Sequence, residues 1–125
     1  MKMVIGGAYQ GKLAYAENTW KDEGRHLDGA VCSWEDLKDC SMIFHLEEFI
    51  RRGIRDGLPV RELPGYLKKE NPGVIIVCRE IGYGIVPMDA FEREYRETVG
   101  RICTQLASDA DEVHRVVCGI GQVIK

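Results

Sequence analysis

The sequence lacks a long apolar run and a large excess of either charge. Its 125 residues contain no stretch near the roughly 20 apolar residues that a membrane-spanning helix requires. The few residues that precede Gly6 are too short for the apolar core of a signal peptide. The net charge of −3 argues against the broad basic surface that neutralises nucleic-acid phosphates. We therefore expect a cytoplasmic protein with no membrane span and no nucleic-acid partner.

The sequence also lacks the cysteine and histidine spacings that hold metals. No two of its five cysteines form a C-x-x-C pair, and an odd number spread along the chain is not a disulfide framework. Most of them lie among apolar neighbours, which is typical of small buried thiols in a reducing compartment. The three histidines, His26, His45 and His114, show no ligand spacing. The sequence predicts free structural thiols and no Cys/His metal centre.

Apolar periodicity predicts alternating strands and helices. The expected strands are residues 3–5, 27–32, 74–78 and 113–118, and the expected helices are 12–20, 42–54, 64–70 and one that starts near Asp89 and passes Leu106. The β-branched run at residues 74–78 favours a strand near the centre of a parallel sheet. This order predicts one α/β domain over residues 1–125, a three-layer sandwich around a mostly parallel sheet of four to five strands.

Residues 6–13, GGAYQGKL, match the phosphate-binding pattern G-x-x-x-x-G-K between a strand and a helix. In such a loop, backbone N–H groups surround phosphate oxygens and the lysine neutralises the β- and γ-phosphates of ATP or GTP. This context favours a P-loop NTPase-like fold with Lys12 as a catalytic residue. The nucleotide-binding candidates are Gly6, Gly7, Ala8, Tyr9, Gln10, Gly11, Lys12 and Leu13. Leu13 stands where the motif has a Ser or Thr hydroxyl for Mg²⁺, so Mg²⁺ is the least supported part of the motif.

A second candidate site follows the strand at residues 74–78. Arg79 and Glu80 stand at its carboxyl end, where ligands bind in open parallel sheets. Arg79 could bind phosphate, and Glu80 could hold Mg²⁺ and serve in catalysis. The alternative is an exposed ion pair between the two. Gly82 and Gly84 suggest a backbone path that a side chain would obstruct. His45, Glu47 and Glu48 lie off the apolar stripe of their helix, and we expect them on a solvated face.

Residues 74–120 read VIIVCREIGYGIVPMDAFEREYRETVGRICTQLASDADEVHRVVCGI. This stretch resembles the bifunctional adenosylcobinamide kinase / adenosylcobinamide-phosphate guanylyltransferase family. That family's pattern is close to V-S-N-E-V-G-x-G-I-V-P, followed by R-x-(F/Y)-R-(D/E), G-x-x-N-Q, A-D-E-V and G-I-P. The matching residues are Glu80, Gly82, Gly84, Ile85, Val86, Pro87, Arg93, Tyr95, Arg96, Glu97, Gly100, Gln105, Ala110, Asp111, Glu112, Val113, Gly119 and Ile120. The family's loop G-G-A-x-S-G-K-S-x-x-A-E is similar to residues 6–17.

The resemblance implies a P-loop fold, a homo-oligomer, typically a trimer, and a role in cobalamin biosynthesis or salvage. It implies phosphoryl transfer from ATP or GTP to the hydroxyl of adenosylcobinamide, a corrinoid. The family then transfers GMP through a histidine that lies in an R-x-x-x-H-R-x-x-R-P-x-x-W region. Residues 21–43 are too short for that region and lack its pattern. We therefore expect guanylyl transfer to be absent, with neither His26 nor His45 carrying GMP.

Departures from the family pattern keep a second hypothesis open. Leu13 replaces the loop hydroxyl, Cys78 and Arg79 replace Ser-Asn, and Gly121 replaces proline. Residues 38–41, KDCS, are similar to the family's D-C-L-T strand. A shortened kinase is the first hypothesis. The alternative is a non-catalytic nucleotide- or corrinoid-binding subunit that keeps only the fold and the oligomer.

Overall fold

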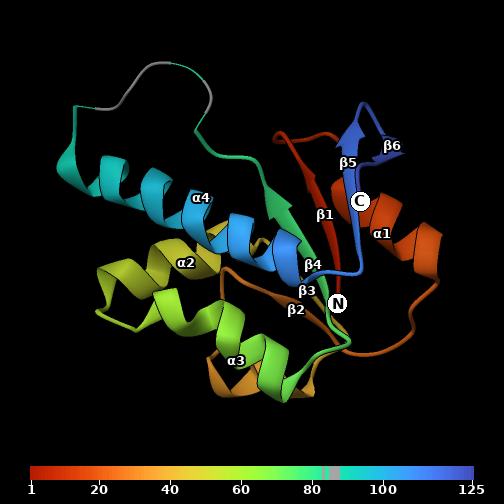
Figure 1. Cartoon of the computed structure of the whole chain (residues 1–125), viewed down its shortest axis with the longest axis horizontal. Helices are drawn as coiled ribbons and strands as arrows, with labels where there is room; N and C mark the ends of the chain where they lie inside the picture. Colours follow the sequence, from red (N-terminus) through yellow and green to blue (C-terminus); the bar gives the residue numbers. More distant parts are fainter. Residues whose placement is uncertain (83, 85–87) are drawn as a thin grey trace.

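The computed structural model describes residues 1–82, 84 and 88–125. These residues form one six-stranded sheet in the order β2-β3-β4-β1-β5-β6 (Figure 1). The strands are β1 (Lys2–Gly6), β2 (His26–Asp28), β3 (Met42–Phe44), β4 (Ile75–Arg79), β5 (Glu112–Val117) and β6 (Ile120–Val123). The helices are α1 (Lys12–Trp20), α2 (Leu46–Arg55), α3 (Leu63–Glu70) and α4 (Ala90–Asp109), with 3-10 turns at Glu35–Asp39 and Val60–Glu62.

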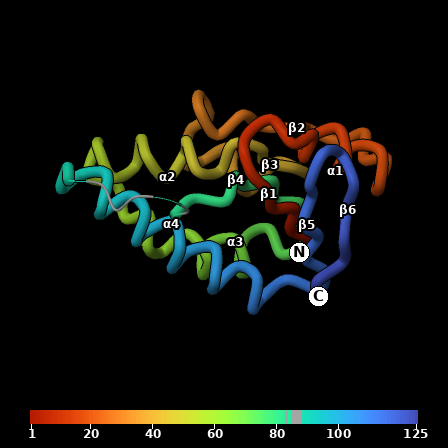
Figure 2. Tube along the Cα trace, turned by 90° about the horizontal axis from the view of Figure 1, so that it is seen from above, coloured from red at the N-terminus to blue at the C-terminus, as the bar shows by residue number. Residues whose placement is uncertain are grey.

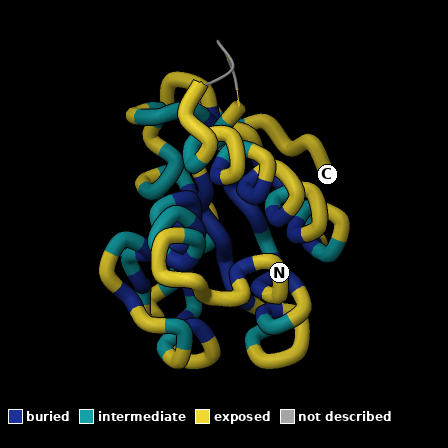
Figure 3. Tube along the Cα trace, turned by 90° about the vertical axis from the view of Figure 1, so that its left-hand side faces the viewer, coloured by how far each residue is buried: buried dark blue, intermediate teal, exposed yellow. Residues whose placement is uncertain are grey.

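The sheet lies between two helical layers, as a three-layer sandwich requires. Figure 1 shows α2, α3 and α4 on one side of the strands and α1 on the other. Met3, Ile43 and Ile76 belong to the larger core, beneath α2, α3 and α4, whereas Val4 and Val77 belong to the smaller core beneath α1. Successive side chains of a strand point to opposite faces, so each central strand contributes to both cores. Figure 3 shows the buried residues concentrated in these interior segments.

The predicted α/β class and the central position of residues 74–78 are confirmed. β4 lies between β3 and β1 and is buried from Ile75 to Cys78. All pairings from β2 to β5 are parallel, and only β6 is antiparallel, to β5. The described residues thus give six strands instead of four to five. Two strands were not expected: β3, and β6, which forms a hairpin with β5 at the opposite end of the molecule from α2 (Figure 2).

The prediction of one helix over residues 42–54 is wrong at its start. Met42, Ile43 and Phe44 form β3, which pairs with β2 and β4, and α2 begins only at Leu46. His45 separates the two elements in the left-handed conformation, at φ 55°. Because a short strand buried on both faces is continuously apolar, the sequence pattern does not separate β3 from the apolar stripe of α2. Residues 38–41, KDCS, which are similar to a strand of the family, end one residue before β3 begins.

The other helix boundaries agree closely with the sequence. Asp89 caps α4 by accepting a hydrogen bond from the Glu92 backbone N–H at 3.1 Å, as its capping pattern indicated. Gly82 and Gly84 have φ angles of 111° and 98°, and a Cβ at either position would meet no atom within 4 Å among the described residues. Glycine therefore suits these positions because of the backbone conformation and not because of crowding. Ile85, Val86 and Pro87 of the resemblance lie outside the described residues.

The helices of the described residues do not include a membrane span. None of them combines the length and the apolar composition that crossing a bilayer would need.

The burial of the cysteines leads to a prediction about their reactivity. Cys32, Cys40 and Cys78 are buried and Cys118 is exposed. Burial raises the pKa of Cys40 to about 11, and a thiol that is neutral reacts slowly. We expect iodoacetamide at neutral pH to modify Cys118 first, with Cys40 reacting only after unfolding in urea. Peptide mass spectrometry over a time course measures this. Labelling of Cys40 at the rate of Cys118 would contradict the fold.

Candidate nucleotide-binding site

The glycine-rich segment forms a loop between β1 and α1. Within it, Tyr9 and Gly11 have φ angles of 57° and 84°, so the backbone turns twice through the left-handed region. Within the described part of the chain, no side chain caps the amino end of α1 by a hydrogen bond. The backbone N–H groups of residues 8–11 have no hydrogen-bond acceptor among the described residues. Unpartnered N–H groups at the start of a helix are suited to binding an anion.

Two contacts fix the position of this loop against the β5–β6 hairpin. The carbonyl oxygen of Gln10 accepts a hydrogen bond from the Gly119 N–H at 2.8 Å, and its side-chain Oε1 accepts one from the Cys118 N–H at 2.7 Å. Gly6 is needed for close packing, because a Cβ there would lie 2.5 Å from the carbonyl oxygen of Val116. The loop is therefore held by the far end of the chain, and Gln10 acts in part as a brace.

Lys12 begins α1 and folds back over the loop. Its Nζ donates a hydrogen bond to the carbonyl oxygen of Gly7 at 2.6 Å. Burial lowers the pKa of Lys12 from its ordinary value, while the nearby carboxylate of Glu47 acts in the opposite direction. A partly desolvated ammonium interacts strongly with an anion because less water screens it. Lys12 is thus positioned to bind a negatively charged group that enters the loop.

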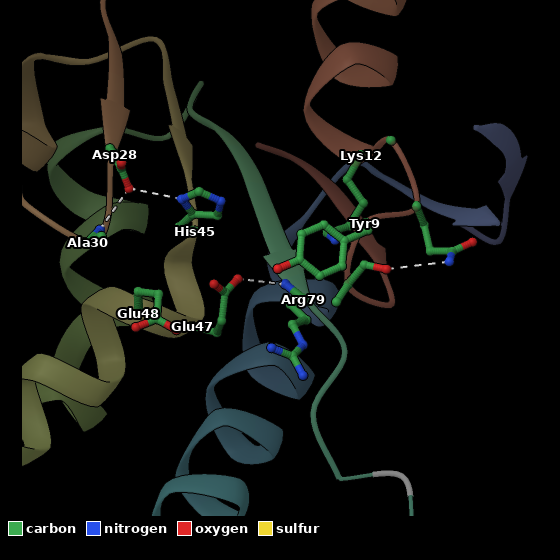
Figure 4. A pocket seen from close by; sticks show the side chains of 11 residues that line it. Tyr9, Lys12, Asp28, Ala30, His45, Glu47, Glu48 and Arg79 are labelled. Atoms are coloured by element: carbon green, nitrogen blue, oxygen red, sulfur yellow. Dashed lines mark hydrogen bonds and ion pairs between the residues drawn. The ribbon is translucent and has the colours of Figure 1, made fainter. Parts of the chain in front are cut away.

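A wall of acidic and imidazole groups faces the loop across a cavity of about 520 Å³ (Figure 4). Asp28 ends β2, His45 follows β3, and Glu47 and Glu48 lie in the first turn of α2. Parallel strands bring their carboxyl ends to one edge of the sheet, so these side chains collect beside the loop that follows β1. The other lining residues are Ala8, Tyr9, Gln10, Gly11, Lys12, Ala30 and Arg79.

The prediction that Glu47 lies on a solvated face is wrong. Its exposed fraction is only 3%, and its Oε1 accepts a hydrogen bond from the Arg79 backbone N–H at 2.9 Å. Figure 4 shows this contact between α2 and the end of β4. A buried carboxylate is costly unless it is paired or hydrogen-bonded, and here Lys12 supplies a nearby positive charge. Glu47 therefore links the acidic wall to Lys12.

Arg79 and Glu80 differ in which cavity they line. Arg79 lines both the main cavity and a smaller one of about 170 Å³, whereas Glu80 lines only the smaller one. Glu80 forms an ion pair with Arg115 of β5, at 3.0 Å between Oε1 and Nε. The expected alternative, a pair between Arg79 and Glu80, is thus replaced by a pair to another strand. The catalytic and metal-binding roles of Glu80 stay predictions.

Leu13 packs away from the loop, in the smaller core beneath α1. It offers no oxygen, and no group of three His, Cys, Asp or Glu residues among the described ones could hold a metal. Mg²⁺ nevertheless needs only one or two protein carboxylates when phosphate oxygens and water complete its octahedral shell. Glu47 and Glu48 are the carboxylates beside the loop that fit this requirement.

The sequence identified the loop, Lys12 and Arg79 but not Asp28, His45, Glu47 and Glu48 as cavity residues. Their shared signal is position, because each lies at or just after the carboxyl end of a parallel strand. That signal was hidden for His45, Glu47 and Glu48 by the assignment of β3 to a helix. For Asp28 it was hidden because the second strand was expected to continue to residue 32, although β2 ends at Asp28.

Comparison with known proteins gives a family and two partial relatives. The sequence model described as "Cobinamide kinase / cobinamide phosphate guanyltransferase" matches residues 53–124, more than half of the chain. Two proteins named "Bifunctional adenosylcobalamin biosynthesis protein CobU", from Salmonella typhimurium and Escherichia coli, are each 48% identical to it over 52 residues. The match covers 42% of this chain but only 29% of each relative.

The family match does not extend to most of the cavity residues. The family match includes Arg79 and Glu80 but not the loop, Asp28, His45 or Glu47. It agrees with the resemblance seen in the sequence and with the α/β class. The chain belongs to the cobinamide kinase / cobinamide phosphate guanyltransferase family, whose fold is of the P-loop NTPase type.

Proposed function

We propose that this protein binds ATP or GTP in the main cavity and transfers the γ-phosphoryl group to the hydroxyl of a cobinamide, in cobalamin biosynthesis or salvage. The observation that carries the proposal is the loop after β1, with unpartnered N–H groups at residues 8–11 and Lys12 beside them. Family membership supplies the acceptor, because kinase and corrinoid chemistry belong to the family description. The relatives' names are consistent with this role.

The cavity residues divide into two roles. The loop and Lys12 would bind the β- and γ-phosphates, and Arg79 would supply a second positive charge at the carboxyl end of β4. Phosphoryl transfer depends mainly on positioning and on charge stabilisation, which these groups provide. Glu47 and Glu48 would hold Mg²⁺, which when bound neutralises charge that develops on the phosphate oxygens. Glu80 remains a less direct candidate because Arg115 already pairs with it.

Guanylyl transfer is not part of the proposal. Residues 21–43 lack the family's histidine-containing pattern, and the two histidines nearby are each paired with an aspartate, His26 with Asp22 and His45 with Asp28. One observation favours a second candidate function, a non-catalytic nucleotide- or corrinoid-binding subunit. Leu13 packs in the core where the motif would offer a hydroxyl to Mg²⁺. Such a subunit would bind nucleotide without needing the metal.

We also propose that the protein forms a homo-oligomer, and a trimer is the specific expectation. Exposed apolar side chains on the β5–β6 hairpin support this: Val117, Ile120 and Val123. An exposed apolar edge strand favours pairing with another chain. Sedimentation velocity would measure the assembly. We also keep the prediction that residues 1–125 are one domain.

The test is a transfer assay with purified protein, cobinamide and γ-labelled GTP or ATP, with and without Mg²⁺. The expected result is labelled cobinamide phosphate in the presence of Mg²⁺ and little without it. The relative from Salmonella typhimurium, assayed in parallel, controls for the substrate. No product beside an active relative would exclude the kinase, and nucleotide binding that is unchanged by EDTA in calorimetry would favour the non-catalytic subunit.

A further inference from the structure

Asp28 and His45 form a pair on the cavity wall that faces the glycine-rich loop. Asp28 Oδ1 lies 3.0 Å from His45 Nδ1 and also accepts a hydrogen bond from the Ala30 N–H at 2.9 Å. The His45 ring packs edge-on against Phe44, with ring centroids 5.0 Å apart. The imidazole is therefore held on one side by a carboxylate and on another by an aromatic ring.

The backbone around this pair is built for close approach. Asp28 and Phe44 are register partners at the ends of β2 and β3, and the Gly29 N–H donates to the Phe44 carbonyl at 2.8 Å. A Cβ on Gly29 would lie only 2.2 Å from the His45 carbonyl oxygen, so only glycine allows this contact. His45 itself adopts a left-handed conformation that few side chains tolerate. Strain of this kind in a cavity wall is typical of functional positions.

The hydrogen bond fixes which nitrogen of the neutral ring is free. A carboxylate only accepts, so His45 Nδ1 carries the hydrogen and Nε2 keeps its lone pair. In Figure 4 the second nitrogen lies on the side of the ring away from Asp28, toward the Lys12 side of the cavity. The His45 side chain is 56% exposed, which leaves Nε2 accessible to a molecule that enters the cavity.

We propose that His45 is the proton acceptor for the hydroxyl that receives the phosphoryl group, with Asp28 as its positioning residue. This inference rests on the proposed function. As the acceptor oxygen bonds to the γ-phosphorus, its proton moves to His45 Nε2. The bond between the γ-phosphorus and the β–γ bridging oxygen breaks, and the nucleoside diphosphate leaves with that electron pair. Asp28 stabilises the imidazolium that forms.

The groups that line the same cavity as His45 come from four elements and the loop. They are Asp28 at the end of β2, Glu47 and Glu48 on α2, Lys12 at the start of α1, Arg79 at the end of β4, and Tyr9 in the loop. A phosphate group bound near Lys12 would therefore lie in the same cavity as His45.

The test compares His45→Asn, Asp28→Asn and His26→Asn in the transfer assay. Asparagine tolerates the left-handed conformation and caps helices well, so His45→Asn keeps the backbone of β3 and α2. His26 forms a similar pair with Asp22, at 2.9 Å, but does not line the cavity, which makes it the matched control. We expect His45→Asn to lower kcat about 10²-fold or more and His26→Asn to leave it within about twofold. Nucleotide Kd is expected to stay unchanged in all three.

The kinetic constants separate a base from a structural residue. His45→Asn should lower kcat while the KM values for cobinamide and for nucleotide stay close to those of the wild type. Asp28→Asn should lower kcat at least about tenfold, because the amide also stabilises the wrong tautomer. A His45→Asn variant that keeps the wild-type kcat, or that loses only affinity, would overturn the inference.

Nitrogen-15 NMR of the imidazole distinguishes failure of this inference from failure of the proposed function. If the wild type makes no cobinamide phosphate, the proposed function is wrong, and the tautomer still decides on the pair. A hydrogen on Nδ1 with a free Nε2, whose resonance moves when ATP or GTP is added, supports His45 as a base in the nucleotide cavity. A hydrogen on Nε2 of the neutral ring, or no response to nucleotide, overturns it.

Discussion

Replacing Lys12 with alanine is expected to lower the rate of cobinamide phosphorylation by about 10²–10³-fold, the usual cost of removing one preorganised charge from a reacting anion. Lys12 is partly buried beside the loop, and its hydrogen bond to the carbonyl oxygen of Gly7 ties its ammonium to the loop. Nucleotide affinity should fall as well, because charge-assisted hydrogen bonds to phosphate are lost. Single-turnover transfer assays and calorimetry with GTP measure the two effects separately.

The matched control for Lys12 is Lys69→Ala, which removes an exposed lysine at the end of α3 that does not line the main cavity. It should change neither rate nor affinity. A stronger challenge comes from the wild type itself. If ATP and GTP produce no thermal shift, and Lys12→Ala behaves as the wild type does, the loop is a structural turn and the nucleotide-binding proposal is wrong.

The sequence predicted those strands and helices whose local residue pattern agrees with their place in the fold. Residues 3–5, the glycine-rich loop and the helix from Lys12 form a strand, loop and helix in which pattern, turn chemistry and topology point the same way. The β-branched run at residues 74–78 likewise fits only a buried strand. Such segments can be read locally because each carries its own period and its own boundary residues.

The cavity residues Asp28, His45 and Glu47 could not be predicted from a local sequence pattern. Asp28 and His45 are 17 residues apart, and what brings them together is the parallel pairing of two three-residue strands. Glu47 looked solvated because the apolar stripe of α2 was extended back through β3. Errors of a few residues at two boundaries, the end of β2 and the start of α2, thus hid these cavity residues, since ligands bind at the edge of a parallel sheet where the strands end.

The family match and most of the cavity residues lie in different parts of the chain. Residues 53–124 supply α3, β4, α4, β5 and β6, which form much of the larger core and the hairpin that braces the loop. Apart from Arg79, all the residues that line the main cavity lie before residue 53. The matched part of the chain therefore supports the site from behind. Most of the cavity residues come from the part where similarity to the family rests on the loop pattern and on residues 38–41.

Glu47→Gln is expected to slow phosphoryl transfer by about 10–100-fold, the usual effect of changing a group that supports a metal or a reacting charge. Glutamine keeps an Oε1 that can accept the Arg79 N–H, so the fold should be retained. The negative charge of Glu47 raises the pKa of Lys12, and glutamine lacks that charge. Without Glu47 the pKa of Lys12 falls further below its ordinary value. The alkaline limb of the pH–rate profile should therefore move to lower pH, and more Mg²⁺ should be needed for half-maximal rate.

The alanine variant separates charge from structure at this position. Glu47→Ala removes the acceptor as well and leaves the Arg79 N–H without its partner, which should cost about 1–3 kcal/mol of unfolding free energy in urea. Glu47→Gln should be close to the wild type in the same measurement. Glu70→Gln, at the exposed end of α3, is the matched control for losing one carboxylate. If Glu47→Gln loses stability but keeps both the wild-type rate and its alkaline limb, Glu47 only ties α2 to β4. A shifted limb with unchanged stability means that its charge acts on Lys12 during transfer.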